Sequence, residues 1–196
     1  MKVTLLQKKG NVAETEFRAE LDRVIRNLIG KLFAKVTFHS FTTEGWSRVS
    51  IDGDDAEVAV ELLSRKFGIA PGDIANVALH GNYRGVIRET SSSNLIVDIG
   101  INHPKPTFIN VKLSALLAQL ADGRQSTSIR KITQNYCLLP ETPISIRVTR
   151  LTANVIEGWL SDSQISIFTR WITSGLERIL VFDCLPSQLA SVMTKA

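Results

Sequence analysis

The first 68 residues alternate between the period of a strand and the period of a helix. A strand is predicted at 2–9, and apolar residues at helical spacing then predict a helix that ends at Gly30. Two strands, at 32–38 and 46–51, and a helix that ends at Gly68 follow. The order strand, helix, strand, strand, helix is that of a ferredoxin-like split βαβ motif without its last strand.

Three helix starts carry a polar residue followed three positions later by Glu or Gln, which is the pattern of a capping box. The pairs are Asn11 with Glu14, Asp54 with Glu57, and Ser161 with Gln164. We therefore expect a helix to begin at each pair.

The middle of the chain predicts five short strands with a helical insertion. The strands are expected at 83–89, 95–99, 107–111, 143–152 and 154–161, and the helices at 113–123 and 126–139. The third strand follows Pro106 directly, so we interpret it as an edge strand. Five strands with helices between the third and fourth match the Greek-key OB barrel.

The last segment predicts a helix, a strand and a helix. The first helix ends at Gly175, the strand is RILVFDC at 178–184, and Pro186 suits the first position of the last helix. This strand could complete the N-terminal sheet. The expected α+β organisation is a ferredoxin-like domain at 1–76, an OB-type barrel at 77–161 and a C-terminal segment at 162–196.

Composition places the chain among folded, non-membrane proteins. It has 196 residues, 44% of them apolar and 21% charged. Its apolar runs are far shorter than the roughly 20 residues of a membrane span, and the N-terminus lacks a signal pattern, so we expect a cytoplasmic protein. Cys137 and Cys184 follow no metal or disulfide spacing and are interpreted as reduced thiols.

Positive charge is concentrated in the middle of the chain. Residues 78–158 carry nine Lys and Arg against five Asp and Glu, which accounts for the whole net charge of +4. A phosphate-binding surface requires such a concentration, because each neutralised phosphate releases counterions. The alternative is a solvated basic face.

Four arginines lie on the first and fourth predicted strands of the barrel. Arg84 and Arg88 share one side of their strand by the period of two. Arg147 and Arg150 lie on opposite sides of theirs unless a bulge intervenes.

The inserted helices carry another basic group. Arg124, Arg130 and Lys131 surround an expected helix start at Ser126 or Thr127, where backbone N–H groups face an incoming anion. The segment is therefore a candidate phosphate cradle. An ordinary capped helix with solvated basic residues is the alternative.

Two segments carry a family resemblance. GNYRGVIRETSSSNLIVDIGI and IRVTRLTANVIEGWLS resemble the opening strands and the closing hairpin of the RNA-binding OB domain repeated in the largest small-subunit ribosomal protein. The resemblance covers about residues 78–161. With its flanks, the whole chain is similar to a family of uncharacterised archaeal proteins known as a domain of unknown function. The resemblance implies a fold and a binding mode without an activity.

The chain departs from the ribosomal type in its aromatic residues. That type carries rings for base stacking on the second strand, whereas Ser93 and Ile96 stand near the matching positions. Tyr83 is a candidate replacement because polar residues flank it and a phenol suits a half-exposed position. His103, in a loop beside Lys105, is expected to be exposed, and Phe108 is interpreted as a core residue.

Motifs of catalysis and metal binding are lacking. The sequence has no P-loop, no G-x-G-x-x-G, no G-x-S-x-G and no zinc spacing. Four acidic residues close together could be interpreted as a metal-binding cluster: Asp52, Asp54, Asp55 and Glu57. Helix capping accounts for Asp54 and Glu57 without a metal and is preferred. We expect no cofactor and no enzymatic activity.

The sequence thus predicts a non-catalytic RNA-binding protein, with salt-sensitive binding of about micromolar strength and low sequence preference. Its candidate site residues are Tyr83, Arg84, Arg88, His103, Lys105, Arg124, Arg130, Lys131 and Arg147. The alternative is a protein-interaction adaptor anchored by Trp159 and Trp171, although burial in the core is expected for both rings. A nucleic-acid hydrolase is a third possibility, without support from a motif.

Overall fold

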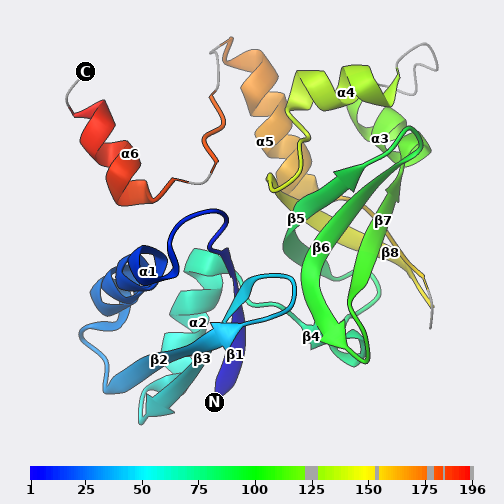
Figure 1. The fold of residues 1–196 in the computed structure, drawn as a ribbon. Helices are drawn as coiled ribbons and strands as arrows, with labels where there is room; N and C mark the ends of the chain where they lie inside the picture. The colour runs from blue at the N-terminus through cyan, green and yellow to red at the C-terminus, as the bar shows by residue number, and fades with distance from the viewer. Residues whose placement is uncertain (122–127, 153–154, 176–178, 183, 195–196) are drawn as a thin grey trace. The chain divides into compact units, whose positions relative to one another are not determined.

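The computed structural model describes residues 1–121, 128–152, 155–175, 179–182 and 184–194. The chain divides into two compact units, one formed by residues 1–70 and 179–196 and the other by residues 71–178 (Figure 1). Each unit has its own hydrophobic core and is described by itself.

The first unit is a three-stranded antiparallel sheet with two helices. Its elements are β1 (Lys2–Lys8), α1 (Glu14–Ile29), β2 (Ala34–Phe41), β3 (Trp46–Gly53) and α2 (Ala56–Phe67). The strand order is β1-β3-β2. Apolar residues that alternate along β1 and β3 meet the apolar stripes of both helices in one core, which includes Leu5, Ile51 and Leu63. The predicted split βαβ order is confirmed.

The position of a fourth strand is taken by the segment that follows α2. Ile69 forms an antiparallel bridge with Leu5 of β1, and the backbone of Ala70 donates to that of Thr4. The strand predicted at 178–184 is not found in its described part, residues 179–182 and 184. That prediction was wrong because an apolar run needs an open sheet edge, and this edge of β1 is already paired.

The second unit is a closed five-stranded barrel. Its strands are β5 (Asn82–Thr90), β6 (Asn94–His103), β7 (Thr107–Lys112), β8 (Pro143–Leu151) and β9 (Ile156–Leu160). Antiparallel pairs run from β7 through β6, β5 and β8 to β9, and a parallel pairing of β9 with β7 closes the circle. This is the strand order of an OB-type barrel, as the sequence predicts.

Two expectations for the barrel strands need correction. The strand at 107–112 is not an edge, because it pairs with β6 on one side and with β9 on the other. Pro106 precedes its first residue and so removes no hydrogen bond from the ladder. β6 also runs past Gly100 to His103, and its end pairs with the short strand β4 (Gly72–Asp73), which precedes the 3-10 turn η1 (Ile74–Asn76).

Two glycines allow the barrel to close tightly. A Cβ on Gly85 would lie 2.3 Å from the Asp98 carbonyl oxygen of β6. A Cβ on Gly158 of β9 would lie 2.4 Å from Cγ2 of Ile146 and 2.8 Å from Cγ2 of Ile109, both of which are fully buried. Glycine is therefore required where β9 packs against the side chains of β8 and β7.

Three helices gather at one end of the barrel: α3 (Leu113–Leu120), α4 (Ile129–Tyr136) and α5 (Asp162–Thr173) (Figure 1). The Gln119 side chain of α3 donates to the Leu160 carbonyl at 2.9 Å and accepts from its N–H at 3.0 Å, which satisfies the end of β9. Tyr136 and Phe168 pack ring against ring beneath the barrel core. No helix of the described residues has the length and apolar character to cross a membrane.

One of the three predicted capping pairs is confirmed in part. Ser161 accepts a hydrogen bond from the Gln164 N–H at the start of α5, but the Gln164 side chain accepts from Ser145 of β8 instead of closing the box. α1 follows Ala13 and α2 follows Asp55, without a side-chain cap at either. The expected starts at Asn11 and Asp54 were each wrong by one or two residues. α6 (Pro186–Met193) begins at the predicted proline.

Candidate nucleic-acid interface

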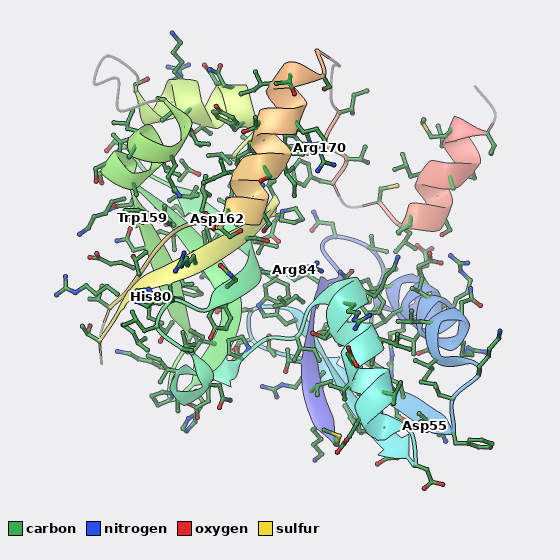
Figure 2. All side chains as sticks on the ribbon, turned by 180° about the vertical axis from the view of Figure 1, so that it is seen from behind. Asp55, His80, Arg84, Trp159, Asp162 and Arg170 are labelled. Carbon is green, nitrogen blue, oxygen red and sulfur yellow. The ribbon has the colours of Figure 1, made fainter. Side chains whose placement is uncertain are left out.

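A row of polar and aromatic side chains crosses the outer side of the barrel over β5, β8 and β9. Arg147 is paired with Trp159 of β9 on one side and with Asn82 of β5 on the other. Ile146 and Val148, which flank Arg147 along β8, are fully buried, so Arg147 and the residues paired with it point outward. Arg84 stands opposite Ser145 and is therefore the diagonal neighbour of Arg147 (Figure 2 labels Arg84 and Trp159).

A bulge brings Arg150 to the same outer side. The β8–β9 register shifts between Val148 and Arg150, so that Arg150 pairs with Glu157. One extra residue in the bulged strand reverses the alternation. The sequence placed Arg147 and Arg150 on opposite sides unless a bulge intervened. The bulge is present, so the two arginines share a face.

Glu157 joins this group to β7. Its carboxylate lies 2.8 Å from the Lys112 ammonium and 3.7 Å from the Arg150 guanidinium. The hydrogen bond from Lys112, helped by the charge of Arg150, holds the pKa of the Glu157 carboxyl below its usual range. The carboxylate is thus charged at neutral pH and orients two cations at the surface.

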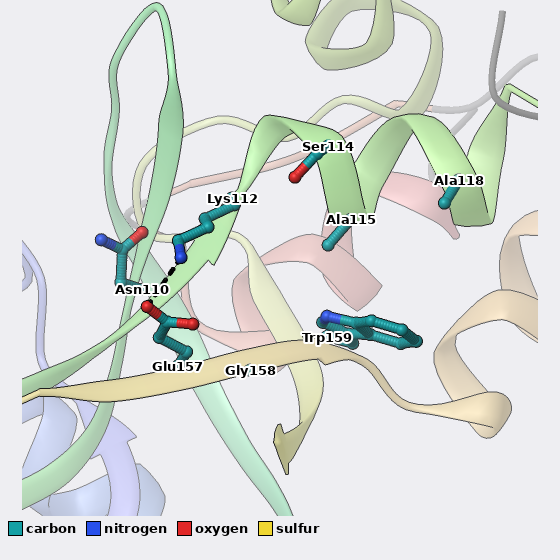
Figure 3. A pocket seen from close by; sticks show the side chains of 8 residues that line it. All are labelled: Asn110, Lys112, Ser114, Ala115, Ala118, Glu157, Gly158 and Trp159. Atoms are coloured by element: carbon teal, nitrogen blue, oxygen red, sulfur yellow. Dashed lines mark ion pairs between the residues drawn. The ribbon is translucent and has the colours of Figure 1, made fainter. Parts of the chain in front are cut away.

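A cleft opens beside Trp159, between α3 and β9. It has a volume of about 270 Å³ and is lined from α3, β7 and β9. It exists because β7 pairs with β9 only at Ile109 and Asn110 before the chain turns into α3, which then runs beside the rest of β9. Figure 3 shows Ala115 and Ala118 pointing from α3 toward the Trp159 ring. Trp159 itself is 51% exposed.

Arg88 lies on another part of the barrel surface. Its guanidinium stacks over the Phe108 ring of β7, 4.3 Å from the ring centroid. Arg88 is exposed on the same outer side as Arg84, as the period of two predicts. Phe108 is half-buried on the outer side of β7, so its interpretation as a core residue was wrong.

Tyr83 does not join the outward row. It is paired with the buried Ile146 and packs against the barrel core, and its hydroxyl accepts from the Ala78 N–H at 2.7 Å. The ring therefore fixes the loop before β5. Its role as a stacking ring stays a prediction, and this geometry does not favour it.

His103 was predicted in a loop but is the last residue of β6, whereas Lys105 lies in the loop between β6 and β7; both are exposed. His103 Nδ1 lies 2.7 Å from Asp73 Oδ2. The Ala75 N–H and, after it, the His103 ring hold the pKa of the Asp73 carboxyl below its usual range. This pair ties the end of β6 to β4.

The basic residues of the helical insertion lie apart from the outward row. Arg130 and Lys131 are exposed in the first turn of α4, whose cap is Ser128 and not the expected Ser126 or Thr127. Arg130 lines a second cleft, of about 540 Å³, beside the serine turn between β5 and β6. Arg124, Ser126 and Thr127 lie outside the described residues, so the predicted phosphate cradle stays a prediction.

Trp159 is exposed, although the sequence predicted its burial. Burial was expected for both tryptophans of this region, but only Trp171 is packed, 5.3 Å from the Phe168 ring centroid. The signal was present, because Ile156 and Leu160 face the core and alternation then places Trp159 outside.

The acidic residues near residue 54 show no metal-binding arrangement. Asp55 accepts a hydrogen bond from the Phe33 N–H at 2.8 Å. Among the residues that the structure describes, no group of three or more His, Cys, Asp or Glu side chains is placed to hold a metal ion.

Comparison with family models covers both units. Residues 2–72 match the DUF2110 N-terminal domain, and residues 78–172 match the DUF2110 central domain. The chain belongs to the DUF2110 family. The predicted membership in a family of unknown function is confirmed, and the outward row lies within the DUF2110 central domain. Comparison with curated proteins gave no match.

Proposed function

We propose that this DUF2110 protein is a non-catalytic RNA-binding protein, and that it holds the RNA backbone on the outer side of its barrel. The observation that carries the proposal is the outward row of Arg147, Trp159 and Arg84 on adjoining strands. Guanidinium groups bind phosphate oxygens bidentately, and an exposed indole beside them offers a base a stacking face. The archaeal origin and cytoplasmic location stay predictions of the sequence.

In this proposal the base-stacking ring is Trp159 and not Tyr83, the ring that the sequence predicted for this role. Arg84 and Arg147 keep the phosphate-binding role that the sequence gave them, and Arg150 and Lys112 extend the positive charge along β8 and β7. Glu157 limits the charge of this extension, so we expect modest affinity that falls steeply with salt.

The test replaces both arginines. Each lost phosphate contact lowers the slope of log K against log salt by roughly 0.7 for a single strand, so Arg84→Ala with Arg147→Ala should lower it by about 1.4. Arg26→Ala with Lys31→Ala removes the same charge from the N-terminal unit and serves as the control. Equal slopes for both double variants would show that net charge, and not this row, drives binding.

A protein-interaction adaptor is the second candidate. Its support is a set of exposed apolar residues near the C-terminus, among them Ile179 at 88% and Met193 at 72% exposure. If the protein self-associates through them, Ile179→Asp with Met193→Asp should lower the mass measured by light scattering. An unchanged mass would remove this support.

A further inference from the structure

The cleft beside Trp159 has the size of a site for one flat ring system. Its volume of about 270 Å³ lies just below the roughly 300–1,000 Å³ of pockets that take drug-sized ligands. The α3 wall of the cleft presents Ala115 and Ala118, whose short side chains leave room beside the indole (Figure 3). A planar group could therefore lie against the indole under a wall of small residues.

The other end of the cleft is polar. Asn110 lies there beside Lys112 and Glu157, as Figure 3 shows. The Asn110 side-chain oxygen is buried and accepts no hydrogen bond from any residue that the structure describes. Buried acceptors without a partner are rare in folded proteins, and one at a cleft suits a ligand that brings its own donor.

We propose that this cleft receives one unpaired nucleobase of the bound RNA, stacked on Trp159, with the Asn110 carboxamide at its edge. This inference rests on the proposed function and names its substrate class, which is single-stranded or looped RNA. A base within a duplex stays stacked on its neighbours and cannot enter. The Asn110 oxygen can accept from the exocyclic amino group of adenine, whereas uracil has no amino group and offers only its N3–H, so we expect adenine to be preferred to uracil.

The phosphates on either side of such a base have partners nearby. Arg147 is the cross-strand neighbour of Trp159, and Lys112 lies at the polar end of the cleft. Lys112 is held by Glu157 at 2.8 Å, but its side chain is 53% exposed, so it can turn to a phosphate at small cost. One strand could thus cross the cleft with its backbone between two cations.

The experiment measures binding of fluorescein-labelled ten-nucleotide oligoadenylate, oligouridylate and a duplex RNA by anisotropy. Trp159→Ala should weaken oligoadenylate binding by roughly 10-fold or more, which is the range of one lost stacking contact, and leave duplex binding unchanged. Trp159→Phe keeps a ring and should retain most of the affinity. Phe33→Ala removes an aromatic ring that is 83% exposed on the N-terminal unit and is the control.

A second readout separates this inference from the proposed function. Oligoadenylate should quench the fluorescence of Trp159, and Trp159→Phe should abolish the quenching, since Trp46 is buried and Trp171 is half-buried. Asn110→Ala should reduce the preference for oligoadenylate over oligouridylate. If Trp159→Ala leaves oligoadenylate binding intact while Arg84→Ala with Arg147→Ala weakens it, the cleft inference fails and the proposed function stands. If none of the three RNAs binds at low salt, both fail.

Discussion

Gly158 gives a direct test of how the barrel closes. It lies in β9 with β8 on one side and β7 on the other, and its backbone is not in the left-handed region. In Gly158→Ala the new Cβ would lie 2.4 Å from Cγ2 of Ile146 and 2.8 Å from Cγ2 of Ile109. Both isoleucines are fully buried among other core residues and cannot move aside.

The expected loss follows from this overpacking. Inserting a carbon into a filled core costs about 1–3 kcal/mol. For a domain near 100 residues, each kcal/mol lowers the Tm by roughly 4–8 °C. The variant should therefore melt at least roughly 4 °C below the wild type in a thermal scan followed by circular dichroism.

A double variant tests the cause. Ile146→Ala removes the nearer methyl group, so the loss for Gly158→Ala with Ile146→Ala should be smaller than the sum of the two single losses, by about 0.5–3 kcal/mol in urea unfolding. An unchanged Tm for Gly158→Ala, or strict additivity, would refute the reasoning that β9 closes against these two side chains.

Three further predictions concern contacts that position the barrel surface. Gln119→Leu leaves the backbone of Leu160 without two hydrogen bonds and should cost about 1–3 kcal/mol in urea unfolding. Tyr83→Phe removes the acceptor for one loop N–H and should cost about 0.5–1.5 kcal/mol in urea unfolding. The pKa of Asp73 is lowered in the folded protein, because its carboxylate bonds to the Ala75 N–H and the His103 ring. These bonds therefore stabilise the fold above about pH 4, and their contribution is lost as the pH falls further. His103→Ala should make the free energy of unfolding fall less as the pH is lowered below this value. An acid unfolding curve that is the same as that of the wild type would contradict this expectation.

Local periodicity predicted the barrel strands and most helix ends, because alternation and glycine stops are read from neighbours in the sequence. It could not predict the bulge that turns Arg150 outward, since a register shift is set by the partner strand. The cleft depends on the parallel pairing of Asn110 with Glu157, which joins residues 47 positions apart. The strand at 178–184 was expected from its apolar run, but the edge it would use is occupied by Ile69.

We propose that the barrel surface binds RNA through its phosphates. The most direct measurement is anisotropy of labelled single-stranded RNA, duplex RNA and single-stranded DNA, each titrated with the full chain at two salt concentrations. We expect binding of about micromolar strength at low salt that weakens steeply at the higher concentration and prefers single-stranded RNA. No binding of any of the three at low salt, or an affinity that does not change with salt, would contradict it.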